Sequence, residues 1–165
     1  TGYYAVSRIL KRNGFSFLTP KTQKYGSGEF KTCPYPNPEF EEAFCESLKI
    51  ADDADLIIAT DPDADRLGVM AKKKGKFVKL SGNEVGYILA EYLISGTKNK
   101  SVVTSVVTSP LIEDICKNHE AKLYKTQNGF KNYGRKEKTG ISRRKLYGVY
   151  AFRIIYHCND IAVIF

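Results

Sequence analysis

Tryptophan is absent from this chain of 165 residues, methionine occurs once, and the four cysteines stand far apart with only two histidines to assist them. Disulfide frameworks and zinc sites need clustered ligands, so we interpret the cysteines as reduced, packed thiols. No run of 18 apolar residues occurs, and residues 1–12 lack the charged-then-apolar pattern of a signal peptide. These absences predict a cytoplasmic protein with no membrane partner.

The first part of the chain carries no net charge, whereas the second part has a large excess of basic residues. Residues 1–75 carry 11 Lys+Arg and 11 Asp+Glu, so the whole net charge of +8 belongs to residues 76–165. Within that part, residues 131–145 hold seven basic residues and one acid, Glu137. The run is either a solvated basic face or a surface for phosphorylated ligands. We expect no nucleic-acid partner, because no aromatic-basic motif accompanies it; binding to DNA is the weakest of the alternatives.

Apolar spacing alternates between helical and strand periods along the chain. The pattern predicts helices at 3–12, 38–51, 83–94 and 110–118, a long loop at 21–38, and strands at 15–18, 54–60, 67–70, 77–80, 101–107 and 121–125. Leu-Ile-Ile-Ala at 56–59 has the pattern of a strand buried on both faces of a parallel sheet. The alternation predicts an α/β fold, three-layer α/β/α, with mixed, mostly parallel sheets.

The most informative residues are Asp61, Asp63 and Asp65, which follow the buried strand directly. Carboxylates at alternate positions converge on one hard cation if the backbone curls, and Mg²⁺ prefers such oxygen ligands. An EF-hand is excluded, because its sixth and twelfth positions would be Arg66 and Lys72 instead of glycine and glutamate. An acidic surface loop without metal remains the alternative on spacing alone.

Three segments together resemble the α-D-phosphohexomutases, in the form typical of bacterial phosphoglucomutase/phosphomannomutase enzymes. Residues 59–69, Ala-Thr-Asp-Pro-Asp-Ala-Asp-Arg-Leu-Gly-Val, resemble the metal-binding loop of that family. Residues 34–39, Pro-Tyr-Pro-Asn-Pro-Glu, resemble a segment of its second domain, and Gly129-Phe130-Lys131 resembles a loop of its third domain. The resemblance extends over about residues 1–135, and the segments follow the order of the family.

The resemblance implies a mechanism and a set of site residues. Members move a phosphoryl group between C1 and C6 of a hexose phosphate through a phosphoserine and a hexose 1,6-bisphosphate, with glucose 1,6-bisphosphate as activator. Asp61, Asp63 and Asp65 would hold Mg²⁺, and Arg66 would contact phosphate oxygens, unless it merely pairs with a neighbouring acid. Gly129, Phe130 and Lys131 would contact the substrate, with Lys131 approaching its phosphate.

The resemblance also implies what is missing. Residues 1–75 would be the C-terminal portion of domain II and residues 76–165 the N-terminal portion of domain III, with a divergent tail from about 136. No phosphoserine loop, sugar-recognition loop or fourth-domain phosphate clamp occurs in the sequence. We therefore expect two incomplete domains that lack domains I and IV, an inactive isolated chain, and a tail outside the third-domain sheet. The alternative is a non-catalytic module that binds metal and phosphosugars.

Overall fold

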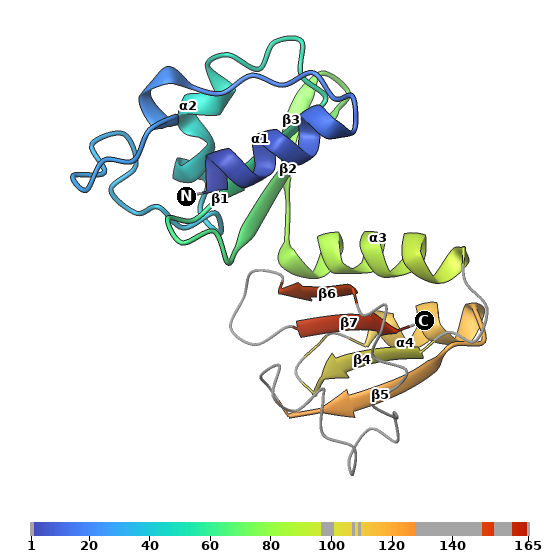
Figure 1. The fold of residues 1–165 in the computed structure, drawn as a ribbon. Helices are drawn as coiled ribbons and strands as arrows, with labels where there is room; N and C mark the ends of the chain where they lie inside the picture. The colour runs from blue at the N-terminus through green and yellow to red at the C-terminus, as the bar shows by residue number, and fades with distance from the viewer. Residues whose placement is uncertain are drawn as a thin grey trace. The chain divides into compact units, whose positions relative to one another are not determined.

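The computed structural model describes residues 2–96, 101–106, 108, 110–127, 150–153 and 160–164. The chain divides into two compact units, Thr1–Ser81 and Gly82–Phe165, whose elements are labelled in Figure 1. Ser81 alone stands between the last strand of the first unit and the first helix of the second. Each unit has its own sheet and its own buried apolar cluster.

The first unit opens with helix α1, Gly2–Arg12. The helix ends where the Asn13 backbone N–H donates to the Ile9 carbonyl at 3.1 Å and Gly14 adopts a φ of +76°, as the Asn-Gly pair predicts. The strand expected at 15–18 is absent, and that prediction is wrong. Phe15 and Leu18 are 64% and 72% exposed, and the three strands of this sheet pair only with one another.

The first sheet has the order β1-β2-β3, built from Leu56–Thr60, Leu67–Lys73 and Lys76–Leu80. Both pairings are antiparallel, so the expectation of a parallel β1 is wrong. The loop at 61–66 is far shorter than the dozen residues that a parallel crossover needs. Lys74 and Gly75, with φ of +49° and +78°, form the tight turn between β2 and β3.

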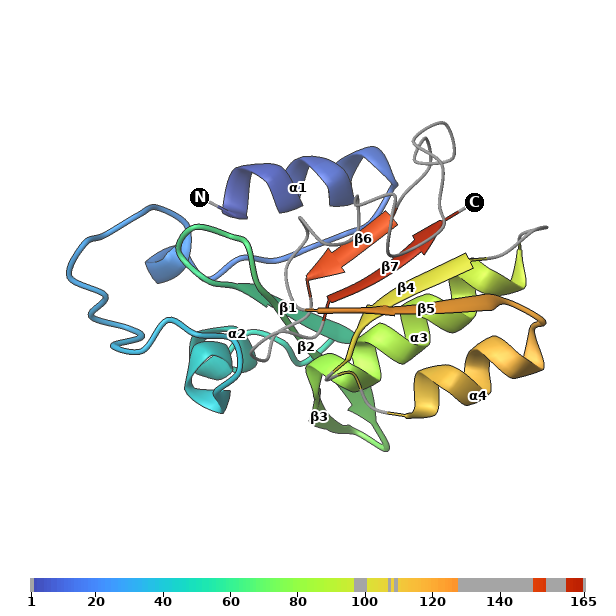
Figure 2. The ribbon, with the colours of Figure 1, turned by 90° about the horizontal axis from the view of Figure 1, so that it is seen from below.

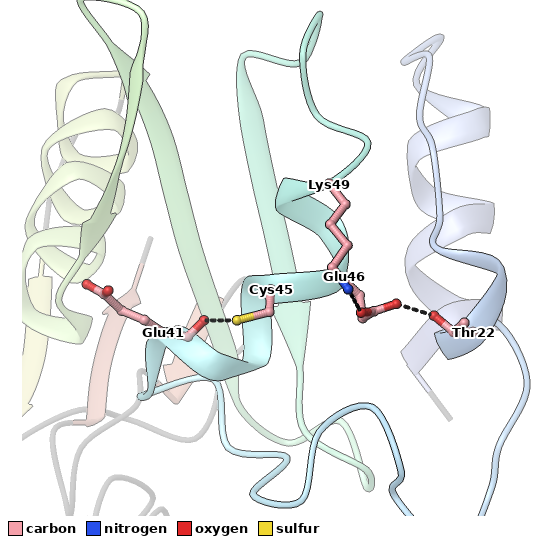
Figure 3. A network of polar contacts seen from close by, with 5 residues as sticks. All are labelled: Thr22, Glu41, Cys45, Glu46 and Lys49. Carbon is pink, nitrogen blue, oxygen red and sulfur yellow. Dashed lines mark hydrogen bonds and ion pairs between the residues drawn. The ribbon is translucent and has the colours of Figure 1, made fainter.

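The connection from α1 to β1 is mostly irregular and contains three short helical turns: η1 (Lys21–Gln23), η2 (Glu41–Phe44) and α2 (Cys45–Leu48). The helix predicted at 38–51 is therefore shorter and begins later. Figure 3 shows polar contacts around α2, where the Thr22 hydroxyl donates to Glu46 Oε2 at 2.7 Å and Lys49 pairs with the same carboxylate. The contact from Thr22 joins η1 to α2. Phe44, fully buried, anchors the segment against Ile57 and Met70 of the sheet.

The second unit places two helices against a mixed sheet of order β5-β4-β7-β6. Its helices are α3 (Gly82–Ser95) and α4 (Leu111–Asn118), and its strands are β4 (Ser101–Ser105), β5 (Lys122–Thr126), β6 (Tyr150–Arg153) and β7 (Asp160–Ile164). Both helices cover the same face of the sheet (Figure 2). Their core with β4 consists of Ala90, Ile94, Val102, Ile112 and Cys116.

Mixed sheets are confirmed, but parallel pairing is not in the majority among the described strands. Only β4 and β5 pair in parallel there, while β7 pairs antiparallel with β4 and β6 with β7. The expectation that the tail stays outside the sheet is wrong for β6 and β7. A β4 edge without a neighbour would expose unpaired backbone groups, and the β-branched run at 160–164 suits a strand there.

None of the helices in the described ranges combines the length and apolar character that a bilayer crossing requires.

Candidate metal-binding loop

The loop at 61–66 joins β1 to β2 and curls back on itself. Its first turn closes where the Ala64 backbone N–H donates to the Asp61 carbonyl at 3.0 Å. Ala64 has a φ of +62°, in the left-handed region that costs a residue with a Cβ about 1–2 kcal/mol. This strained backbone allows the alternate side chains of the loop to come together.

The curl brings three carboxylates to one place. One carboxylate oxygen from each of Asp61, Asp63 and Asp65 lies within 4.8 Å of the other two. Asp61 is only 6% exposed, whereas Asp63 and Asp65 are exposed to solvent. Hard oxygen donors at this separation, anchored by one buried member, fit the ligand preference of Mg²⁺. The sequence prediction that these three residues converge is therefore consistent with the geometry.

Arg66 lies against the carboxylates that precede it. Its backbone N–H donates to Asp61 Oδ1 at 3.0 Å, while its Nε lies 3.3 Å from Asp61 Oδ2 and 3.7 Å from Asp65 Oδ1. The side chain remains 45% exposed. Arg66 therefore fixes the orientation of the Asp61 carboxylate through the backbone and offsets part of the negative charge through the guanidinium.

Burial raises the pKa of the Asp61 carboxyl group above its ordinary value, and repulsion from Asp63 adds to the rise. The backbone N–H of Arg66 acts in the opposite direction. The three acids outnumber the single guanidinium of the loop, so their close approach is unfavourable without a further positive charge. A divalent cation would supply that charge.

Gly68, in β2 directly after the loop, is the residue that sequence reasoning missed. A Cβ at this position would meet the Pro38 carbonyl oxygen at 2.6 Å, Pro38 Cβ at 2.7 Å and Phe44 Cζ at 2.9 Å. The proline-rich segment at 34–39 therefore packs directly on the strand that leaves the aspartate loop. The Asn37 side chain holds this segment in shape by accepting a hydrogen bond from the Glu39 backbone N–H at 3.0 Å. A glycine within a strand pattern was the available signal.

Gly2, the first residue of α1, packs against the last residue of β1, just before the loop. A side chain at Gly2 would collide with Thr60, the residue that precedes Asp61. The start of α1 therefore packs against the end of β1, where the absence of a Cβ permits the close approach.

The third motif, Gly129, Phe130 and Lys131, lies outside the described residues. The same unit has a group of buried hydroxyls at the carboxyl end of β4, from Thr104, Ser105 and Thr108. Thr104 Oγ1 donates to Thr108 Oγ1 at 2.5 Å, and Ser105 Oγ lies 3.2 Å from the same oxygen. These hydroxyls bind one another across the turn that leads to α4.

Each of the two units matches one domain of a known protein family. Residues 1–75 match the family described as phosphoglucomutase/phosphomannomutase, alpha/beta/alpha domain II, and residues 81–142 match domain III of the same enzymes. The chain is 38% identical over 137 residues to a phosphomannomutase of Mycoplasmoides pirum, covering 79% of this chain and 25% of that protein. It is 35% identical to a probable phosphomannomutase of Haemophilus influenzae (81% of this chain, 29% of that protein) and 35% identical to a phosphoglucomutase of Staphylococcus epidermidis (79% and 25%).

The two α/β units thus correspond to consecutive domains of the hexose phosphate mutases. The chain belongs to the phosphoglucomutase/phosphomannomutase family. It spans roughly a quarter of the length of the curated relatives it matches.

Proposed function

We propose that this chain is the metal-holding part of a cytoplasmic, Mg²⁺-dependent phosphohexomutase. The observation that carries the proposal is the convergence of the Asp61, Asp63 and Asp65 carboxylates within 4.8 Å, in a segment that matches domain II of the family. In the proposed whole enzyme, hexose 1-phosphate and hexose 6-phosphate are interconverted through a phosphoserine and a 1,6-bisphosphate, with glucose 1,6-bisphosphate as activator.

Each residue of the loop has a distinct role in this proposal. Asp61, held by the Arg66 backbone N–H, is the fixed ligand, and the exposed Asp63 and Asp65 complete the carboxylate set. Bound Mg²⁺ would supply positive charge that stabilises a transferring phosphoryl group. The guanidinium of Arg66, 45% exposed, would donate to phosphate oxygens. Gly129, Phe130 and Lys131 would contribute a substrate loop from domain III.

The reaction needs more than this chain supplies. No serine in the sequence stands in a phosphoserine motif, so the covalent phosphate carrier would belong to domain I and the distal phosphate clamp to domain IV. We therefore propose that the isolated chain binds a divalent cation but does not turn over hexose phosphate.

Metal titration by calorimetry tests the assignment. Mg²⁺ or Mn²⁺ should bind at one weak site, and Asp63→Asn should abolish the binding because it removes one anionic ligand. Asp53→Asn is the matched control, since Asp53 is also exposed and lies outside the loop. Metal binding that survives Asp63→Asn unaltered, or that is lost equally in Asp53→Asn, would reject the site.

The alternative function is a non-catalytic module that binds metal and phosphosugars, favoured by the missing serine motif. The two functions differ when domains I and IV are supplied. Restored turnover on mixing this chain with those domains of a relative indicates a mutase fragment, whereas metal binding and phosphosugar binding without turnover indicate the module.

A further inference from the structure

Lys79 lies on the face of the first sheet that carries the buried apolar cluster. In the pairing of β2 with β3 it stands opposite Met70, and side chains directly opposite one another in an antiparallel pair project from the same face. Met70 belongs to the cluster that includes Phe44 and Ile57. Lys79 is only partly exposed, so its ammonium group needs a hydrogen-bond partner close to the core.

The partner of this ammonium group is a backbone carbonyl of the proline-rich segment. Lys79 Nζ donates a hydrogen bond to the carbonyl oxygen of Glu39, 40 positions earlier in the sequence. The backbone N–H of Glu39 in turn donates to Asn37 Oδ1 at 3.0 Å. A hydrogen bond from a charged donor is stronger than one from a neutral donor. Lys79 therefore holds the main chain at residue 39 against β3.

The segment held by Lys79 packs on a strand that leaves the aspartate loop. Pro38, the residue before Glu39, is fully buried, and its carbonyl oxygen and Cβ lie 2.6 and 2.7 Å from the place where a Cβ of Gly68 would stand. Gly68 lies two residues after the loop at 61–66, where β2 pairs with β1. A movement of Pro38 would therefore shift the strand ends from which the aspartates extend.

We propose that Lys79 is a positioning residue for the aspartate loop. By holding the Glu39 carbonyl it keeps Pro38 packed on Gly68, and this packing sets the separation of the strand ends that carry the carboxylates. Mg²⁺ demands near-ideal octahedral geometry from its ligands, so a displacement too small to unfold the unit is enough to weaken binding. The proposal rests on the metal site of the proposed function and adds to it a residue outside the loop.

Lys72 is a matched lysine for comparison. It lies two residues after Met70 on β2, and its Nζ also donates to a backbone carbonyl, that of Asp52. This contact joins the far end of β2 to the turn before β1 and does not involve the segment at 34–39. Lys72→Met therefore removes the same charge and the same kind of hydrogen bond without releasing Pro38.

Hydrogen exchange measured by NMR on the full chain, in metal-free buffer, tests the proposal without any ligand. The Ala64 and Arg66 amides donate to the carbonyl and the carboxylate of Asp61. Both should exchange at least about threefold faster in Lys79→Met, because local opening of the loop becomes easier. Both should stay within about twofold of the parent rate in Lys72→Met and in Lys79→Arg, which retains a cationic donor.

Calorimetry with Mn²⁺ measures the consequence at the carboxylates. The affinity should fall about three- to tenfold in Lys79→Met, less than the loss expected for a group bonded directly to a metal ligand. It should fall by less than about twofold in Lys72→Met. If the parent chain binds no Mn²⁺, the proposed metal site fails, while the exchange rates still decide the role of Lys79.

Circular dichroism and urea denaturation verify that each variant folds. If Lys79→Met unfolds, Asn37→Ala releases the same segment from its other side and should accelerate exchange at Ala64 and Arg66 in the same way. Parent-like exchange in Lys79→Met would overturn the proposal, as would equal acceleration in Lys79→Met and Lys72→Met. Loss of protection in Lys79→Arg as large as in Lys79→Met would also overturn it, because the donated hydrogen bond would then not be the cause.

Discussion

At the scale of single residues, the candidate site depends on positions that carry no chemistry. Ala64 accepts a left-handed backbone so that Asp61, Asp63 and Asp65 meet, and Gly68 lets the proline-rich segment lie against β2. The three carboxylates can be identified from the sequence alone because their alternate spacing is unusual. The residues that support them are ordinary in type, and their importance follows only from what they touch.

Gly68→Ala should destabilise the first unit by about 1–3 kcal/mol, because the new methyl group has no space. A Cβ there would stand 2.6 Å from the Pro38 carbonyl oxygen and 2.9 Å from the Phe44 ring. Gly26→Ala is the matched control, since nothing lies within 4 Å of a Cβ at that position. Urea denaturation curves measure both. A Gly68→Ala midpoint equal to that of the control would show that the segment at 34–39 does not pack on β2.

The thiols should differ in reactivity according to burial. Burial raises the pKa of Cys116 from its ordinary value of 9.0 to about 11, whereas Cys45 is exposed. Iodoacetamide at neutral pH should therefore label Cys45 and spare Cys116 until urea unfolds the chain, as peptide mass mapping can measure. Equally fast labelling of both thiols in the native protein would contradict the burial of Cys116.

The raised pKa of Cys116 also makes the stability of the folded state depend on pH. The folded state retains the Cys116 proton more firmly than the unfolded state, so its stabilising contribution is complete below pH 9 and is lost as the pH rises through 11. Cys116→Ser should change the slope of stability against pH in that alkaline window. A slope identical to that of the parent chain would show that Cys116 does not retain its proton.

At the scale of elements, the sequence predicted type and order better than pairing. The helices at 2–12, 82–95 and 111–118 and the strands β1 to β5 appear close to their predicted positions, because apolar periodicity and Gly/Pro punctuation are local signals. The direction of β1 and the membership of β7 in the second sheet depend on partners distant in sequence. The apolar run at 56–59 indicated a strand, but it could not indicate which neighbour that strand would have.

Attachment of α4 to its unit should depend on Ile112 and not on the adjacent Leu111. Ile112 is fully buried in the cluster with Ile94 and Val102, while Leu111 is 48% exposed. Ile112→Ala should therefore cost about 2–5 kcal/mol of unfolding free energy, and Leu111→Ala less than about 1 kcal/mol. Thermal melts of the two variants provide the comparison. Similar melting temperatures would contradict the orientation of α4.

At the scale of the whole molecule, the chain should bind metal without catalysis. A coupled assay with glucose 1-phosphate, Mg²⁺ and glucose 1,6-bisphosphate should give no glucose 6-phosphate above background, because no phosphoserine donor is present in the sequence. The protein must be free of host mutase, and Asp63→Asn provides the parallel blank. Turnover that is lost in Asp63→Asn would mean that one of the serines of this chain carries the phosphate.

The boundary between the two units at Ser81 has a consequence for recombination between related genes. Each half has its own sheet and its own buried cluster, and the first family match ends at residue 75 while the second begins at residue 81. A genetic crossover at Ser81 would therefore exchange one half between relatives without dividing a described strand pair. A crossover within 61–66 would instead take β1 and β2, which pair along their whole shared length, from two different parents.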